Sequence, residues 1–266
     1  MISLTDQLGR EVSLDHWPVR IISTVPSQTE LLYYLGLDTE IAGITKYCTH
    51  PANKTINKLK IGGTKQLDIP LIRSLKPDLI IANKEENERL QLEELMIEYP
   101  VYVSDPHDLI SALQMIKHVG ALVDHEAQAN ELITAINAKF EKFNPPNVFT
   151  NAAYLIWRKP YMAAGKNTFI DDMLRRCGFK NVFDVDRYPE VSLDMLKDAD
   201  ADIILLSSEP YPFKEKHVAE LSSTIPDIRI KLVDGEMFSW YGSRLLLAAD
   251  YFMTLTDNMN NTDKRN

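Results

Sequence analysis

Cysteines and long apolar runs are scarce in this chain, and each absence excludes a class of protein. The 266 residues include only two cysteines, Cys48 and Cys177, and their separation matches no metal-ligand spacing. A single disulfide remains open as an alternative to the preferred interpretation of two reduced, partly buried thiols. No stretch is long and apolar enough to predict a transmembrane helix. We therefore expect a protein that is not integral to a membrane.

Positive charge is also in short supply. The formal net charge is -9 and the pI is near 5.2, whereas nucleic acids and anionic membranes normally demand a basic face. We expect neither as a partner. Residues 1–20 contain several charged side chains and no uninterrupted apolar segment, so they do not resemble a secretion signal. Either the mature form is numbered from an added methionine, or the protein stays in the cytoplasm.

The usual catalytic motifs are missing. The chain contains no GxGxxG, GxxxxGK[ST] or GxSxG sequence, and His125-Glu126 is not followed by the second histidine of a zinc-protease helix. His125 is thus predicted to be a solvated first-turn residue. Ser27 follows Pro26, but no histidine lies nearby in sequence to activate it, so we predict a helix cap or ligand contact. The sequence predicts no enzyme; action on a bound chelate is the weaker alternative.

One long helical pattern occupies the middle of the chain, over residues 108–143. Asp124 can cap its most regular part, in which apolar residues recur at helical spacing. Pro106 precedes the pattern and Asn144-Pro145-Pro146 ends it, because proline lacks the N–H that a continuing helix needs. Twenty helical residues extend about 30 Å. We interpret this segment as a rigid strut between two halves, with an ordinary amphipathic core helix as the alternative.

Strands and helices alternate on both sides of this segment. Predicted strands cover residues 20–25, 40–45, 78–82, 101–104, 148–157, 203–206 and 228–233. Predicted helices cover residues 27–36, 70–75, 87–98, 168–177, 193–197, 217–221 and 243–255. Residues 5–14 are expected to form a hairpin turning at Gly9, and residues 257–266 a frayed polar tail. In the first helix, Ser27 and Glu30 match the S-x-x-E pattern of a capping box.

This alternation predicts the α/β class, with parallel, doubly wound sheets. We expect two Rossmann-like lobes, over residues 1–107 and 147–266, bridged by a helical segment over residues 108–146. In open parallel sheets, ligands bind beyond the carboxyl ends of the strands. Two such lobes facing each other would place a ligand in the cleft between them.

Aromatic and cationic residues follow several of the predicted strands. Aromatic faces stack on a large, flat ligand, while cations meet its carboxylate, phosphate or amide groups. The candidate ligand-binding residues are Ser27, Tyr47, His50, Lys65, Trp157, Arg158, Trp240, Tyr241 and Arg244. For each of them, ordinary surface packing is the alternative. Cys48 and His50 make an incomplete metal site, so we predict no bare metal; His50 is a polar contact or an axial ligand to a chelated metal.

Several motifs, in their order, resemble those of a known family. They include Thr5-Asp6-Gln7-Leu8-Gly9-Arg10, Pro26-Ser27-Gln28-Thr29-Glu30-Leu31-Leu32, Gly62-Gly63-Thr64-Lys65 and Gly242-Ser243-Arg244. Nearly the whole chain is similar to the solute-binding proteins of ABC importers for cobalamin and iron-siderophores. The resemblance implies two Rossmann-like lobes bridged by one long α-helix, as in class III periplasmic binding proteins. It also implies a monomer, with limited opening and closing.

The same resemblance implies a function. The protein would capture a metal chelate, either a cobalamin-like corrinoid or a ferric siderophore, in the interlobe cleft and deliver it to an ABC permease. Cobalamin or the siderophore would be transported ligand, with no covalently bound cofactor. The location implied is the periplasm or the cell surface.

Family members dock on the permease through an acidic residue on each lobe. Asp194 stands at the second of these positions. Pro70 stands at the first, with Asp68 two residues away. Cobalamin binders also tend to present a tryptophan near Thr64, where this chain has none. A cytoplasmic corrinoid or metal-chelate carrier or sensor of the same fold is therefore the alternative.

Overall fold

The computed structural model describes residues 2–143 and 150–263, the last six of them as backbone only. The chain forms two compact units. Unit 1 comprises Met1–Pro106, Ile110–Asn137 and Tyr241–Arg244; unit 2 comprises His107–Leu109, Ala138–Trp240 and Leu245–Asn266. Helix α6 (Glu126–Lys142) carries the chain from unit 1 into unit 2.

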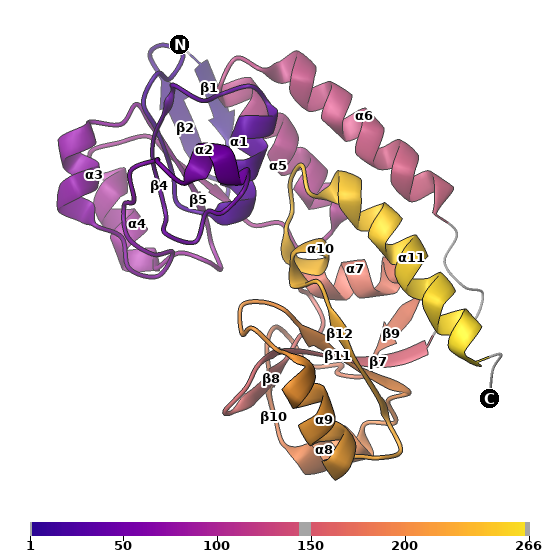
Figure 1. Cartoon of the computed structure of the whole chain (residues 1–266). Coiled ribbons are helices and arrows are strands. Elements are labelled where there is room, and N and C mark those ends of the chain that lie inside the picture. Colours follow the sequence, from indigo (N-terminus) through magenta and orange to yellow (C-terminus); the bar gives the residue numbers. More distant parts are fainter. Residues whose placement is uncertain (1, 144–149, 264–266) are drawn as a thin grey trace. The chain divides into compact units, whose positions relative to one another are not determined.

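A four-stranded parallel sheet forms the centre of unit 1 (Figure 1). Its strand order is β4 (Ile41–Ile44), β3 (Ile21–Ser23), β5 (Leu79–Asn83) and β6 (Val101–Ser104). The strands β3, β5 and β6 are buried throughout, as expected for a parallel sheet covered on both faces. The four strands predicted from residues 20–104 are confirmed.

Helices lie between these strands of unit 1 and after the last of them. They are α1 (Pro26–Tyr34), α2 (Ala52–Thr55), α3 (Ile69–Leu75), α4 (Arg89–Met96) and α5 (Leu109–Leu122). The predicted capping box at the start of α1 is wrong. The N-cap is Val25, without a side-chain cap bond, and Ser27 lies buried inside the helix. Pro26 at the first helical position, with its fixed φ, begins the helix before Ser27 can cap it.

The predicted N-terminal hairpin is present, with β1 (Ile2–Thr5) antiparallel to β2 (Glu11–Leu14). Gly9 turns the chain at φ +79°, a conformation that glycine adopts without steric cost. Its first strand begins three residues earlier than predicted, because Ile2 already pairs with Leu14.

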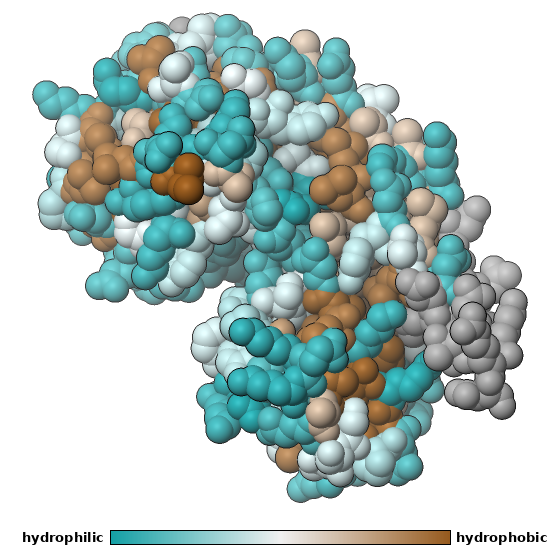
Figure 2. Space-filling model, viewed as in Figure 1, coloured by the Kyte–Doolittle hydropathy of each residue, from teal (hydrophilic) through white to brown (hydrophobic). Residues whose placement is uncertain are grey.

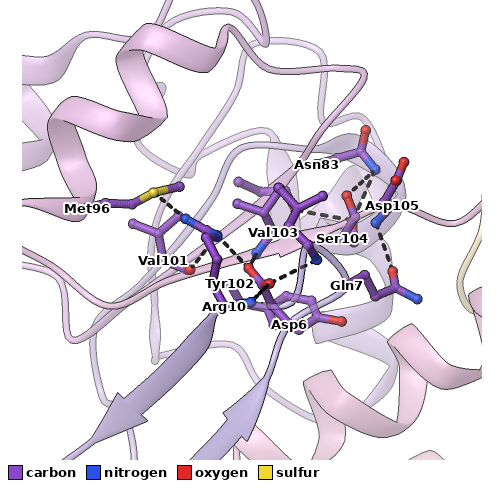
Figure 3. Close-up of polar contacts among 12 residues, drawn as sticks. Asp6, Gln7, Arg10, Asn83, Met96, Val101, Tyr102, Val103, Ser104 and Asp105 are labelled. Carbon is purple, nitrogen blue, oxygen red and sulfur yellow. Dashed lines mark hydrogen bonds and ion pairs between the residues drawn. The ribbon is translucent and has the colours of Figure 1, made fainter.

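Asp6 joins this hairpin to the edge strand β6 (Figure 3). Its carboxylate accepts hydrogen bonds from the amides of Leu8 and Arg10, both at 2.9 Å, and of Val103 at 3.3 Å. The Arg10 guanidinium lies 2.5 Å from the same carboxylate and also donates to the Val101 carbonyl. The side chain of Asp6 is fully buried, so these donors replace the water that it loses.

The predicted helical segment over residues 108–143 consists of two helices, not one continuous helix. Helices α5 and α6 are separated at Asp124, which has φ +61°. A Cβ on Gly120 would lie 2.3 Å from the Ala129 Cβ, so α6 packs closely against the end of α5. Aspartate tolerates the left-handed conformation, and the apolar spacing does not reveal it. The predicted stop at Asn144-Pro145-Pro146 lies outside the described residues.

Unit 2 contains a mixed sheet with the strand order β10 (Glu190–Val191), β8 (Tyr161–Ala163), β7 (Thr150–Trp157), β11 (Ile203–Ser207) and β12 (Arg229–Val233). Strand β9 (Phe179–Asn181) also pairs with β7. Strands β7, β9, β11 and β12 are parallel, whereas β8 and β10 are antiparallel additions. The sequence predicted β7, β11 and β12 but not the three short strands, which are too brief to show alternation.

The helices of unit 2 are α7 (Phe169–Cys177), α8 (Leu193–Asp198), α9 (Glu215–Thr224), α10 (Gly235–Ser239) and α11 (Leu245–Asp263). The helix predicted over residues 168–177 is confirmed as α7, which begins one residue later: the Thr168 hydroxyl caps it, and Gly178 ends it in the left-handed conformation. The frayed tail predicted from residue 257 is wrong as far as Asp263. Helix α11 continues there because propagation from a packed segment costs little.

The two cysteines are free, as expected, but both are fully buried rather than partly buried. Burial raises the pKa of both thiols. Among the described residues, no helix is long and apolar enough to cross a membrane. On the face drawn in Figure 2, hydrophilic residues separate smaller hydrophobic areas in both units.

Candidate ligand-binding edges

The carboxyl ends of the parallel strands define one edge in each unit. We call residues 24–27, 45–51 and 84–88 the unit 1 edge, and residues 157–160, 208–213 and 234–240 the unit 2 edge. Six predicted site residues belong to unit 1: Ser27, Tyr47, His50, Lys65, Tyr241 and Arg244. The other three, Trp157, Arg158 and Trp240, belong to unit 2. Such edges are where ligands of open parallel sheets bind.

Tyr47 presents an aromatic ring on the unit 1 edge. It follows β4 closely and is 53% exposed. The backbone at Gly63 lies against the ring, since a Cβ there would be 3.2 Å from a ring carbon, and the Lys46 Nζ lies 5.1 Å from the ring centroid. Two neighbours therefore hold the ring in place while about half of it remains exposed. An aromatic face held in this way is suited to stacking on a planar ligand.

His50 is half-buried on the loop after Tyr47. Its neighbour Cys48 is buried, with its Sγ 3.1 Å from the Thr29 hydroxyl and 3.2 Å from the Thr45 hydroxyl. Among the described residues, no three His, Cys, Asp or Glu side chains are grouped to hold a metal ion. The axial-ligand role of His50 stays a prediction.

Lys65 joins two loops of unit 1. Its exposed side chain donates from Nζ to the carbonyl oxygens of Glu85, at 2.7 Å, and Asn87, at 3.3 Å. The Asn87 side chain in turn donates to the Thr64 carbonyl at 3.0 Å and accepts from the Thr24 hydroxyl at 2.8 Å. The Lys65 ammonium therefore already has two acceptors before any ligand arrives.

The segment Tyr241–Arg244 packs on α1, and this brings three predicted residues together. The Tyr241 hydroxyl donates to Glu86 Oε1 at 2.7 Å, and burial, with the Glu86 charge second, raises the Tyr241 pKa well above its ordinary value. A Cβ on Gly242 would lie 3.2 Å from the Ser27 carbonyl oxygen, so only a residue without a side chain passes here easily.

Arg244 and Glu30 form the closest charged pair of this contact. Nε and Nη2 of Arg244 lie 3.0 and 2.6 Å from the two carboxylate oxygens of Glu30. Only 8% of the Arg244 side chain is exposed. A bidentate pair of this kind fixes both side chains, so Arg244 has a structural partner that the sequence did not suggest.

Trp157 is the aromatic counterpart of Tyr47 on the unit 2 edge. It ends β7, is 41% exposed and meets Tyr211 edge to face, with ring centroids 5.8 Å apart. Tyr211 meets Phe213 edge to face as well, and its ring is tilted against that of His217. The exposed indole thus stands on a rigid aromatic cluster.

Arg158, the next residue, is engaged by Glu220. Its Nη2 lies 2.5 and 2.7 Å from the two Glu220 oxygens, and these hydrogen bonds are the main cause that raises the Arg158 pKa. The predicted cation is therefore neutralised locally. Glu220 was missed because it lies 62 residues away on α9.

Trp240 is buried, with 7% exposure, and its Nε1 donates to Glu209 Oε1 at 2.7 Å. Glu209 follows β11 and was not predicted as a site residue. Its position directly after a buried strand was the signal that could have found it. Burial raises the Glu209 pKa, and the charges of Glu236 and Asp234 act in the same direction.

Two α/β units, with aromatic residues at the carboxyl edges of their sheets, fit the class of ABC-transporter solute-binding proteins. Residues 21–226 match the model of the family described as periplasmic binding protein, and the chain belongs to that family. The cobalamin and iron-siderophore resemblance and the predicted fold class are confirmed.

Individual relatives agree with this assignment. The Vitamin B12-binding protein of Yersinia pestis (strain Pestoides F) is 23% identical over 244 residues, covering 86% of this chain and 83% of that protein. A possible iron-binding periplasmic solute-binding protein from Staphylococcus epidermidis ATCC 12228 is 26% identical, with a TM-score of 0.75 and coverage of 92% and 99%. The apo heme-binding protein RhuT from Roseiflexus sp. RS-1 is 21% identical, with a TM-score of 0.74 and coverage of 90% and 98%.

The two acids predicted to dock on a permease lie on helices. Asp194 is in the first turn of α8, and 88% of its side chain is exposed. Asp68 is exposed and caps α3 by accepting a hydrogen bond from the Leu71 amide at 3.0 Å. Both carboxylates are accessible, and their docking role stays a prediction.

Proposed function

We propose that the protein reversibly captures a metal chelate, a corrinoid or a ferric siderophore, and delivers it to an ABC permease. The observation that carries this proposal is the pair of exposed aromatic residues, Tyr47 and Trp157, each close to the carboxyl end of a parallel strand. Rings held in this way gain stacking energy on a flat ligand without losing much side-chain entropy. Relatives named for vitamin B12, iron and heme support the ligand class.

No covalent step belongs to this function. Ser27 is buried inside α1, away from the role of an activated nucleophile. His50 would serve as a polar contact or axial ligand to the chelated metal. Asp194 and Asp68 would meet cationic residues of the permease.

Calorimetric titration with cobalamin, cobinamide, heme and several ferric siderophores tests the proposal, with absorbance spectra recorded alongside. We expect micromolar or tighter binding of one chelate, equivalent to about -8 kcal/mol or better. Trp157→Ala should weaken the affinity for this chelate about tenfold, because the stacking of a planar group such as a nucleobase on an aromatic side chain contributes roughly 1–3 kcal/mol. A spectral change lost in His50→Ala would indicate axial ligation.

Trp17→Ala is the matched control, since Trp17 is 44% exposed but is not among the residues of either edge. It should leave the affinity unchanged. Absence of binding to every chelate, or equal losses in the two tryptophan variants, would contradict the proposal.

A further inference from the structure

One carboxylate oxygen of the half-buried Glu209 is engaged inside unit 2, whereas the other has no hydrogen-bond donor among the described residues. Oε1 accepts both the Ser239 hydroxyl, at 2.5 Å, and the Trp240 indole N–H, at 2.7 Å. Oε2 accepts no hydrogen bond from the described residues. It is also not among the side-chain atoms that are buried without a partner. The residue lies two positions after β11, on the unit 2 edge. One strong acceptor is therefore open at the edge where a ligand is expected.

The backbone around Glu209 is fixed. The Ser207 hydroxyl donates to the Glu209 carbonyl at 2.5 Å, and the buried Tyr154 hydroxyl donates to Ser207 at 3.1 Å. A Cβ on Gly235 would lie 2.7 Å from the Glu209 Cγ and 2.3 Å from the Ser207 hydroxyl. The carboxylate is thus oriented before binding, so little conformational entropy is lost when a ligand meets it.

The charges that act most strongly on Glu209 are also negative. They belong to Glu236 and to Asp234, which caps α10. On the same edge Lys159 is exposed, but the Arg158 guanidinium is held by Glu220. A ligand carboxylate close to Oε2 would be repelled by the negative charges of Glu209, Glu236 and Asp234, and the Arg158 guanidinium is already paired. A ligand amide N–H would instead donate a charge-assisted hydrogen bond to Oε2.

We propose that Glu209 is a specificity-determining residue, whose open oxygen accepts amide donors of the ligand and disfavours chelates that carry carboxylates. This inference rests on the proposed chelate-binding function and narrows it: the ligand is an amide-bearing, non-anionic chelate of the corrinoid type. The repulsion of ligand carboxylates contributes to this selectivity as much as the hydrogen bond to ligand amides does.

Titration of the full chain with dicyanocobinamide, which carries amides, and with heme, which carries two propionates, tests this assignment. The wild-type protein should bind cobinamide at least tenfold more tightly than heme. Glu209→Gln keeps an acceptor for Ser239 and Trp240 but removes the charge, so the ratio of the two affinities should narrow about tenfold. Glu215→Gln, at an exposed position of α9, should leave the ratio unchanged.

A second measurement needs no variant. Added salt screens exposed charges, so heme affinity of the wild-type protein should improve relative to cobinamide as ionic strength rises. A wild-type preference for heme, or an unchanged ratio in Glu209→Gln, would overturn the inference while leaving chelate binding intact. Binding of neither compound, nor of any other chelate, would overturn the proposed function as well.

Discussion

Glu209, besides its proposed role in ligand selection, affects the stability of the fold. Its pKa is raised mainly by burial, with Glu236 and Asp234 adding to the shift. The folded state therefore holds a proton on this group more readily than the unfolded chain does. Ionised Glu209 costs folding free energy, and this cost is absent below the unfolded-state pKa and develops as pH rises through the folded-state value.

A glutamine at this position cannot ionise, so the Glu209→Gln variant does not lose the folding free energy that ionised Glu209 costs. We expect the melting temperature of Glu209→Gln, relative to wild type, to shift upward between pH 4 and pH 7. Thermal unfolding at the two pH values measures this, with Glu215→Gln as the control. The difference in melting temperature between the variant and the wild type could instead be equal at the two pH values, or larger in favour of the variant at pH 4. Either result would show that the ionised carboxylate is not destabilising.

Other residues show how polar groups that look like ligand contacts can have internal partners. Arg158 is held by Glu220, and Arg244 by Glu30. Tyr47 and Trp157, in contrast, keep roughly half of their surface exposed. Exposure therefore distinguishes Tyr47 and Trp157 from the buried candidates Trp240, Tyr241 and Arg244. The two exposed aromatic residues carry the proposed function.

At the scale of elements, the attachment of the N-terminal hairpin depends on one buried carboxylate. Asp6 receives amides from its own turn and from β6, together with the Arg10 guanidinium (Figure 3). The motif that includes Asp6 and Arg10 thus has a structural role, as a clamp between the hairpin and the edge of the unit 1 sheet.

Asp6→Asn should lower the free energy of unfolding by about 2–4 kcal/mol, because it replaces one acceptor oxygen with an NH2 group that faces buried donors, and it removes the negative charge that pairs with Arg10. Denaturant unfolding followed by circular dichroism measures the loss. Asp15→Asn is the control, since Asp15 is exposed on the segment after the same hairpin, and it should change stability by less than about 0.5 kcal/mol. Equal effects of the two changes would refute the clamp.

The central helices also show what an element-level pattern can hide. The apolar spacing over residues 108–143 continues through the break at Asp124, because both helices bury a face in unit 1. The turn is shown by the positive φ of Asp124 and by the contact of Gly120 with Ala129.

On the scale of the whole molecule, the segment Tyr241–Arg244 belongs to unit 1 although the residues on either side of it belong to unit 2. Its Arg244 pairs with Glu30, 214 residues earlier in the chain. Unit 1 therefore includes a segment from near the C-terminal end of the chain.

Arg244→Met should lower the free energy of unfolding by about 3 kcal/mol, since it leaves a largely buried carboxylate without its guanidinium. The exposed pair of Arg89 and Glu93 provides the control: Arg89→Met should cost less than about 0.5 kcal/mol. Chemical denaturation of both variants gives the comparison. A loss for Arg244→Met no larger than that for Arg89→Met would mean that the segment does not stabilise unit 1.

The sequence by itself determined the α/β class, the main parallel strands and helix α7, because buried strands and capped helices are written in local spacing and in residues such as Thr168 and Gly178. It also indicated the family through motifs in order. Tertiary structure alone decided the partners: Glu220 for Arg158, Glu86 for Tyr241 and Glu30 for Arg244 are 62, 155 and 214 residues away. Such pairings depend on which helices and strands come into contact in the folded chain, and local sequence patterns do not predict those contacts.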